Sequence, residues 1–141
     1  MLFDAVDGAV ARAGGRATKW GAYLDALVDR YGEGLVVVSV AAVTGTWLLS
    51  SLVLLGALLV SYAKARAAME VPVSNQEWPD LMERAERGLV YVAGLTMSQV
   101  VTWTPLGHDL FWWTLVVLAG LIHVTVWQRM RRAYQLIHQR Q

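Results

Sequence analysis

The chain has 141 residues, of which 56% are hydrophobic and seven are Trp, and its formal net charge is +1. This length limits it to one domain. The near balance of charge gives no argument for nucleic-acid binding, and the absence of Cys excludes a disulfide framework. The first residues are acidic and form no basic region, so no signal peptide is predicted.

Four carboxylates lie close together near the N-terminus. Asp4 and Asp7 are three residues apart, and Asp25 and Asp29 are four apart. Each pair therefore shares one face of a predicted helix. Residues 13–16 read Ala-Gly-Gly-Arg, which predicts a reversal of the chain that would let the two pairs face each other.

Converging carboxylates repel one another and are costly to bury without a partner. The usual resolution is a hard divalent cation with oxygen ligands, Mg²⁺ or Mn²⁺, because no Cys is present and the three His are distant in sequence. Two such ions suit a diphosphate, whose oxygens they bridge. The alternative is that each Asp is a helix cap or a solvated position. Ionisable residues beside membrane spans usually have a function, which favours the metal site over this alternative.

An almost unbroken apolar run extends over residues 34–62. As one helix it would be ~44 Å long, well over a ~30 Å hydrocarbon core. We therefore predict two spans with a turn at residues 44–46. The first would begin near Gly21, and the second would run from about Trp47 to Ala63.

The second half of the chain predicts two more spans. After a loop, a helix restarts at residues 78–80 with Pro in a tolerated first-turn position, and it becomes apolar over residues 88–103. A turn at residues 104–107 precedes the last span, from about Leu110 to Trp127. The predicted fold is an all-α, polytopic membrane helix bundle with about four transmembrane helices.

The positions of the basic residues test this topology. With four spans, all twelve Lys and Arg fall on one side of the membrane, and the turns at residues 44–46 and 104–109 contain none. The positive-inside rule then makes this an integral cell-membrane protein with its Asp cluster facing the cytoplasm. Trp residues would form an outer aromatic belt at Trp47, Trp103, Trp112 and Trp113, and an inner one at Trp20 and Trp127.

The pattern D-x2-D-G-x2-A-R-x8-G-x3-D-x3-D resembles the signature of the CDP-alcohol phosphotransferases. Every fixed position is matched, by Asp4, Asp7, Gly8, Ala11, Arg12, Gly21, Asp25 and Asp29. The resemblance implies a membrane enzyme that moves a phosphatidyl-type group from a CDP-linked lipid to an alcohol and releases CMP. It also implies a homodimer, and a single domain over residues 1–141 that lacks the family's usual upstream helix and a half.

The same resemblance assigns roles to the matched residues. Asp4, Asp7 and Asp25 would bind the metal ions. Asp29 would complete the metal site and act as the base on the acceptor hydroxyl. The CDP moiety would be bound by Gly8, Ala11, Arg12 and Gly21, whose three small members would let a flat ligand approach the backbone closely.

Segments 61–67 and 82–88 resemble the branch of the family that uses inositol phosphate. That resemblance implies that Lys64, Arg84 and one of the C-terminal arginines, for which we choose Arg129, hold the acceptor's phosphate. Cations suit a phosphorylated acceptor, and Arg offers bidentate pairing. The alternative role of these side chains is to determine topology and to contact lipids.

Several other residues receive structural assignments. We expect Arg87 to form a surface ion pair with Glu83, and His123 to be a hydrogen-bonded packing residue. Small side chains that could let helices pack closely are those of Gly32, Gly34, Gly56 and Ala57.

Three other functions remain open. The nearest is a transferase of the same family that uses glycerol phosphate. A second is a truncated, non-catalytic membrane subunit. The third, an ion or metal transporter, is disfavoured because the acidic residues cluster at one face of the membrane and transporters usually bind their ions near the midplane.

Overall fold

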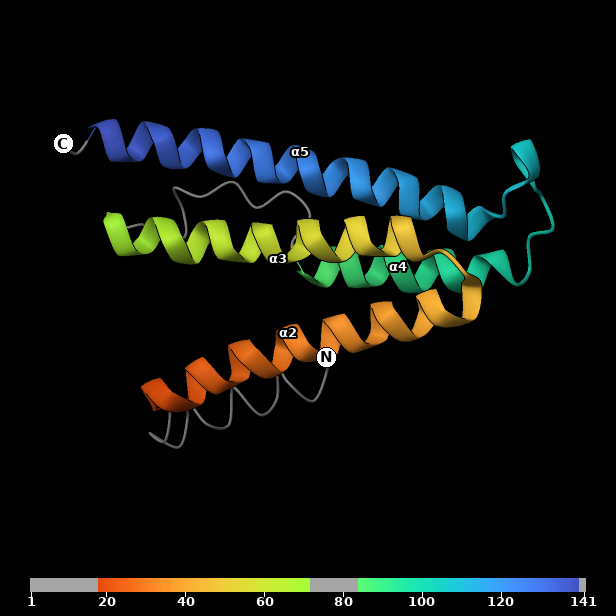
Figure 1. Ribbon diagram of the computed structural model, residues 1–141, viewed down its shortest axis with the longest axis horizontal. Helices are drawn as coiled ribbons and strands as arrows, with labels where there is room; N and C mark the ends of the chain where they lie inside the picture. The colour runs from red at the N-terminus through yellow and green to blue at the C-terminus, as the bar shows by residue number, and fades with distance from the viewer. Residues whose placement is uncertain (1–17, 72–83, 140–141) are drawn as a thin grey trace. The chain divides into compact units, whose positions relative to one another are not determined.

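The computed structural model describes residues 18–71 and 84–139, which form four α-helices and one 3-10 turn (Figure 1). The elements are α2 (Lys19–Thr44), α3 (Trp47–Glu70), α4 (Arg84–Ser98), η2 (Pro105–Gly107) and α5 (Leu110–Gln139). These ranges contain no strand, which confirms the all-α class. The predicted reversal at residues 13–16 and the predicted helix start at residues 78–80 lie outside the described residues.

The break between the first two predicted spans is confirmed. Helix α2 ends at Thr44 and α3 begins at Trp47. Gly45 between them has φ +72°, in the left-handed region that favours glycine. The Oγ1 atoms of Thr44 and Thr46 lie 2.8 Å apart, and Thr46 Oγ1 lies 3.1 Å from Ser50 Oγ. A short chain of hydroxyl groups therefore joins the two helices at this turn.

Two helices are longer than the predicted spans, and one is shorter. Helix α3 continues past Ala63 to Glu70, where Arg66 and Glu70 form an ion pair at 2.7 Å, and α5 continues to Gln139. Helix α4 ends at Ser98, before the predicted limit at residue 103, because the next residues form a turn. Three β-branched residues follow there, at positions 100–102, and such residues have low helix propensity.

Within the described part of the chain, α3 and α5 are long and apolar enough to cross a membrane, with hydropathies of 1.8 and 1.9. Helices α2 and α4, which we also predicted as spans, do not meet this criterion. Helix α4 has 15 residues, which is ~22 Å. Residues 19–33 of α2 carry five charged side chains: Lys19, Asp25, Asp29, Arg30 and Glu33.

The chain divides into two compact units, residues 1–36 and 37–141. In the second unit, α5 packs against both α3 and α4, and α3 and α5 run in the same direction (Figure 1). Gly56 lets α3 approach α5 closely, because a Cβ at this position would overlap the Ile122 side chain. This confirms the role predicted for Gly56. The same prediction was wrong for Gly32, where a Cβ would meet nothing within 4 Å among the described residues. The buried core consists of Val37, Val53, Val60, Tyr91, Phe111, Leu115, Leu118, Ala119 and Ile122.

A second, smaller cluster lies where α3 and α5 continue beyond the predicted spans. Ala67 and Leu136 are buried there, with Val71 and Ala133 packed against them. The C-terminal extensions of the two helices are therefore held together by apolar contacts of their own.

Candidate active site

The first unit carries the described half of the acidic motif. Helix α2 begins beside Thr18, whose Oγ1 accepts a 3.0 Å hydrogen bond from the backbone N–H of Gly21. Asp25 and Asp29 follow on one face of the same helix, one turn apart; Asp25 is exposed and Asp29 is half-buried. The sharing of a face, predicted from the spacing, is confirmed for this pair.

The other half of the motif lies outside the described residues. This applies to five predicted site residues: Asp4, Asp7, Gly8, Ala11 and Arg12. Among the residues that the structure describes, no three His, Cys, Asp or Glu side chains converge on a possible metal position. The two described carboxylates do fit a Mg²⁺ or Mn²⁺ site in their chemistry, because both offer hard oxygen donors from one helix face.

Next to these carboxylates, α2 contains an ion pair that the sequence analysis did not single out. The Arg30 Nη1 atom lies 3.2 Å from Glu33 Oε2, and the two side chains are 25% and 18% exposed. The spacing of three residues on a helix was the signal that could have predicted this pair.

The second unit carries the cations predicted to hold an acceptor phosphate. Lys64 lies on α3 and Arg84 is the first residue of α4, and both are half-buried. Arg129 lies on α5 and is buried, and its Nη1 donates a 2.7 Å hydrogen bond to the backbone carbonyl of Val60 on α3. The later parts of α3 and α5 lie at one end of the unit, and α4 begins nearer the middle of their length (Figure 1).

The burial of Arg87 contradicts one prediction. We expected this residue in a surface ion pair with Glu83, which lies outside the described residues, but Arg87 is 4% exposed. It is buried because it shares the packed face of α4 with Tyr91 and Gly94. The spacing of these residues, four and then three, is the signal that could have placed Arg87 on the inner face. Sequence reasoning thus missed a buried cation.

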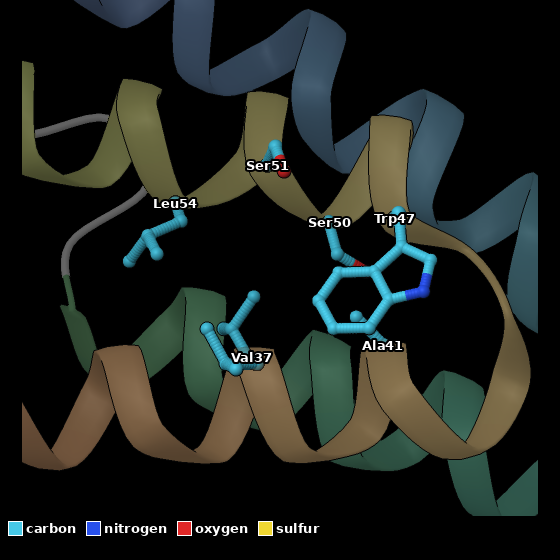
Figure 2. A pocket seen from close by; sticks show the side chains of 7 residues that line it. Val37, Ala41, Trp47, Ser50, Ser51 and Leu54 are labelled. Atoms are coloured by element: carbon cyan, nitrogen blue, oxygen red, sulfur yellow. The ribbon is translucent and has the colours of Figure 1, made fainter.

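Two further features of the second unit do not belong to the candidate site. The His123 Nδ1 atom lies 2.9 Å from the carbonyl oxygen of Ala119 on its own helix, as a packing histidine would. A cavity of about 30 Å³ lies between α2 and α3. Figure 2 shows the Trp47 ring and Ser50 on one side of this cavity, with Val37 and Ala41 opposite. It has room for about one water molecule and no charged lining residue, so it cannot hold a nucleotide.

Helices throughout the described regular structure, two candidate spans and the complete eight-position acidic signature together point to a membrane-bound class of transferase. The family model for CDP-alcohol phosphatidyltransferase matches residues 1–127 of this chain. The chain therefore belongs to the CDP-alcohol phosphatidyltransferase family. Together with α3 and α5, this membership places it in the membrane.

Two curated relatives show which members of the family this chain resembles. The chain is 35% identical over 138 residues to the archaetidylinositol phosphate synthase of Methanothermobacter thermautotrophicus, a match that covers 95% of this chain and 65% of the relative. It is 39% identical over 139 residues to the phosphatidylinositol phosphate synthase of Mycobacteroides abscessus, covering 92% and 59%. The chain thus spans 59–65% of the length of these two relatives.

A solved structure has the same fold. The phosphatidylinositol phosphate synthase of Mycobacterium tuberculosis, crystallised with CDP-DAG bound, matches with a TM-score of 0.77 and 28% identity. The match covers 94% of this chain and 68% of that one.

Proposed function

We propose that this protein transfers a diacylglycerol-phosphate or archaeol-phosphate group from a CDP-linked lipid to inositol phosphate and releases CMP. The observation that carries the proposal is the complete eight-position signature from Asp4 to Asp29, in a chain of this family. The names of the relatives support inositol phosphate as the acceptor. The bound CDP-DAG of the similar structure supports the lipid donor.

The proposed reaction exchanges a phosphoanhydride bond for a phosphate ester bond. The acceptor hydroxyl attacks the lipid-side phosphorus of the diphosphate, a new P–O bond forms, and the bond to the CMP leaving group breaks. Asp29 takes the hydroxyl proton. This side chain is half-buried on α2, so a helix rather than a loop would position it.

Asp4, Asp7, Asp25 and Asp29 would hold one or two Mg²⁺ or Mn²⁺ ions. When bound, such ions would neutralise the charge of the diphosphate and favour departure of CMP. Gly8, Ala11, Arg12 and Gly21 would bind the CDP moiety. Gly21 lies in the first turn of α2 beside Thr18, where a small side chain leaves the backbone accessible.

The acceptor's phosphate would bind to cations of the second unit. Lys64, Arg84 and Arg129 were predicted for this role, and we add Arg87 because it is a buried cation in the first turn of α4, close to Arg84 in the chain. A buried guanidinium can bind a phosphate strongly, because charge-assisted bidentate hydrogen bonds are stronger away from water. The basic residues of α3, α4 and α5 also favour a cytoplasmic site. The homodimer remains a prediction.

The test is CMP release by the purified chain in lipid vesicles. The donors would be CDP-diacylglycerol and CDP-archaeol, with Mn²⁺ or Mg²⁺, and the acceptors inositol phosphate, glycerol phosphate, serine and inositol. We expect release that depends on inositol phosphate. Release that depends on glycerol phosphate instead would favour the branch of the family that uses this acceptor. No CMP release with any acceptor would favour a non-catalytic membrane subunit.

Two substitutions test the mechanism in this assay. Asp25→Asn and Asp29→Asn should each lower turnover at least ~100-fold without unfolding the protein, because each removes a negative charge from the site. Asp109→Asn is the matched control. Asp109 Oδ1 accepts a hydrogen bond from the backbone N–H of Trp112, and Asn retains that oxygen. Retained activity in Asp29→Asn would refute the proposed base.

A further inference from the structure

The ion pair of Arg30 and Glu33 lies directly after the acidic face of α2. Its atoms are 3.2 Å apart and both side chains are largely buried, at 25% and 18% exposure. Around the helix axis, Glu33 lies about 40° from Asp29 and Arg30 about 100° from it. Glu33 therefore lies on nearly the same side of the helix as Asp29, one turn further along, and there it pairs with Arg30. Residues 34–44, which follow, carry no charge.

We propose that Glu33 is a positioning residue for the divalent cations of the proposed reaction. It holds Arg30 and neutralises its charge, so that the negative charge of Asp25 and Asp29 remains available to the cations. This inference rests on the proposed function. It assigns a role to two residues outside the eight-position signature.

The charges of this segment support the role. Asp25, Asp29 and Glu33 carry three negative charges and Arg30 carries one positive charge, so the segment has a formal charge of −2. Without the charge of Glu33 the sum would be −1. The charge of Arg30 would then oppose the binding of a divalent cation by the neighbouring Asp29, and partly buried charges are screened less by salt than exposed ones.

The test measures Mn²⁺ binding to the full chain without substrate, from the electron paramagnetic resonance signal of free Mn²⁺. We expect Glu33→Gln to raise the Kd on the order of tenfold. Arg30→Gln should lower the Kd or leave it unchanged. The double substitution Arg30→Gln with Glu33→Gln restores the formal charge of −2, so its Kd should return to within about twofold of the unsubstituted value.

The matched control is Glu70→Gln, which breaks the exposed Arg66–Glu70 pair on α3 and should leave Mn²⁺ binding unchanged. Glu33→Asp, which keeps the charge, should retain binding. Thermal unfolding of each variant shows whether a loss of Mn²⁺ binding comes from a loss of fold. The double substitution makes a further distinction: if Glu33 had only a structural role, the double substitution would bind Mn²⁺ as weakly as Glu33→Gln.

Two outcomes would overturn this inference and leave the proposed function standing. Glu33→Gln that binds Mn²⁺ as the unsubstituted chain does would show that the pair has no influence on the cations. A double substitution as weak as Glu33→Gln would show that Glu33 acts as a ligand or a packing residue and does not act through Arg30. If the unsubstituted chain binds no Mn²⁺, both the metal dependence of the proposed function and this inference are refuted.

Discussion

Arg129 joins α5 to α3 through its guanidinium. One guanidinium nitrogen donates to the carbonyl of Val60, a residue 69 positions earlier in the chain. The planar fork of Arg carries several N–H donors in one plane, a geometry that suits a phosphate as well as a carbonyl. A single side chain can therefore tie α5 to α3 and still take part in binding the acceptor's phosphate.

This view of Arg129 predicts the effect of Arg129→Lys. The ammonium group is a compact point charge that can serve the carbonyl or a phosphate but does not reproduce the fork. We expect the KM for inositol phosphate to rise about tenfold, the equivalent of ~1.4 kcal/mol, and the KM for the CDP-lipid to stay unchanged. Arg131→Lys, on the exposed side of the same helix, is the control. An equal effect of both substitutions would show that Arg129 was the wrong choice among the C-terminal arginines.

Arg87 and Arg84 give a second comparison at the scale of the residue. Arg87 is 4% exposed and Arg84 is half-buried. If Arg87 binds the acceptor's phosphate, Arg87→Gln should raise the KM for inositol phosphate more than Arg84→Gln does, by about tenfold or more, because a desolvated ion pair is stronger than a solvated one. Steady-state kinetics at varied acceptor concentration measures this, and thermal unfolding checks the fold. A larger effect of Arg84→Gln would show that Arg84, and not Arg87, makes the stronger contact with the phosphate.

At the scale of the helices, the contact of α3 with α5 depends on one small residue. A Cβ on Gly56 would overlap Ile122 and would lie 3.1 Å from His123 Cε1. Gly56→Ala should therefore lower the free energy of unfolding by about 1–3 kcal/mol, as expected of an overpacked core. Unfolding by denaturant in detergent micelles would measure the change.

Gly120 on α5 supplies the control for this substitution. A Cβ at Gly120 would meet nothing within 4 Å. Gly120→Ala should leave stability unchanged or raise it by up to about 1 kcal/mol, because Ala loses less conformational entropy than Gly when a helix forms. If both substitutions destabilise equally, the close contact at Gly56 is not what limits the packing of α3 on α5.

The helices themselves were largely predictable. The turn at residues 44–46 followed from an apolar run too long for one span, and Gly45 marks it. The positions where helices end were predicted less well, because α3 continues to Glu70 and α4 ends at Ser98. Such ends depend on side-chain ion pairs and turn hydrogen bonds, each of which is a small energetic term that the apolar pattern does not contain.

At the scale of the whole molecule, the distribution of Lys and Arg predicts the orientation in the membrane. The sequence contains no Cys, so single reporters can be introduced without removing any. His108→Cys, in the turn before α5, should react with a membrane-impermeant maleimide added outside intact cells. Gln139→Cys, at the end of α5, should react only after the membrane is opened. The reverse pattern would place the Asp cluster on the outer side.

The sequence by itself determined the family, the acidic signature and the helical class. These properties are local: a motif is a set of spacings, and a helix is a periodicity of apolar residues. It also placed Asp25 and Asp29 on one face of α2, since both belong to the same helix.

Only the tertiary structure decided which polar side chains are buried. The burial of Arg87, the bond from Arg129 to Val60 and the fit of Gly56 against Ile122 all depend on how α3, α4 and α5 pack together. The last two contacts join residues more than sixty positions apart. The face that a helix buries is set by the shape and chemistry of the helices it meets, and no spacing within one segment records those partners.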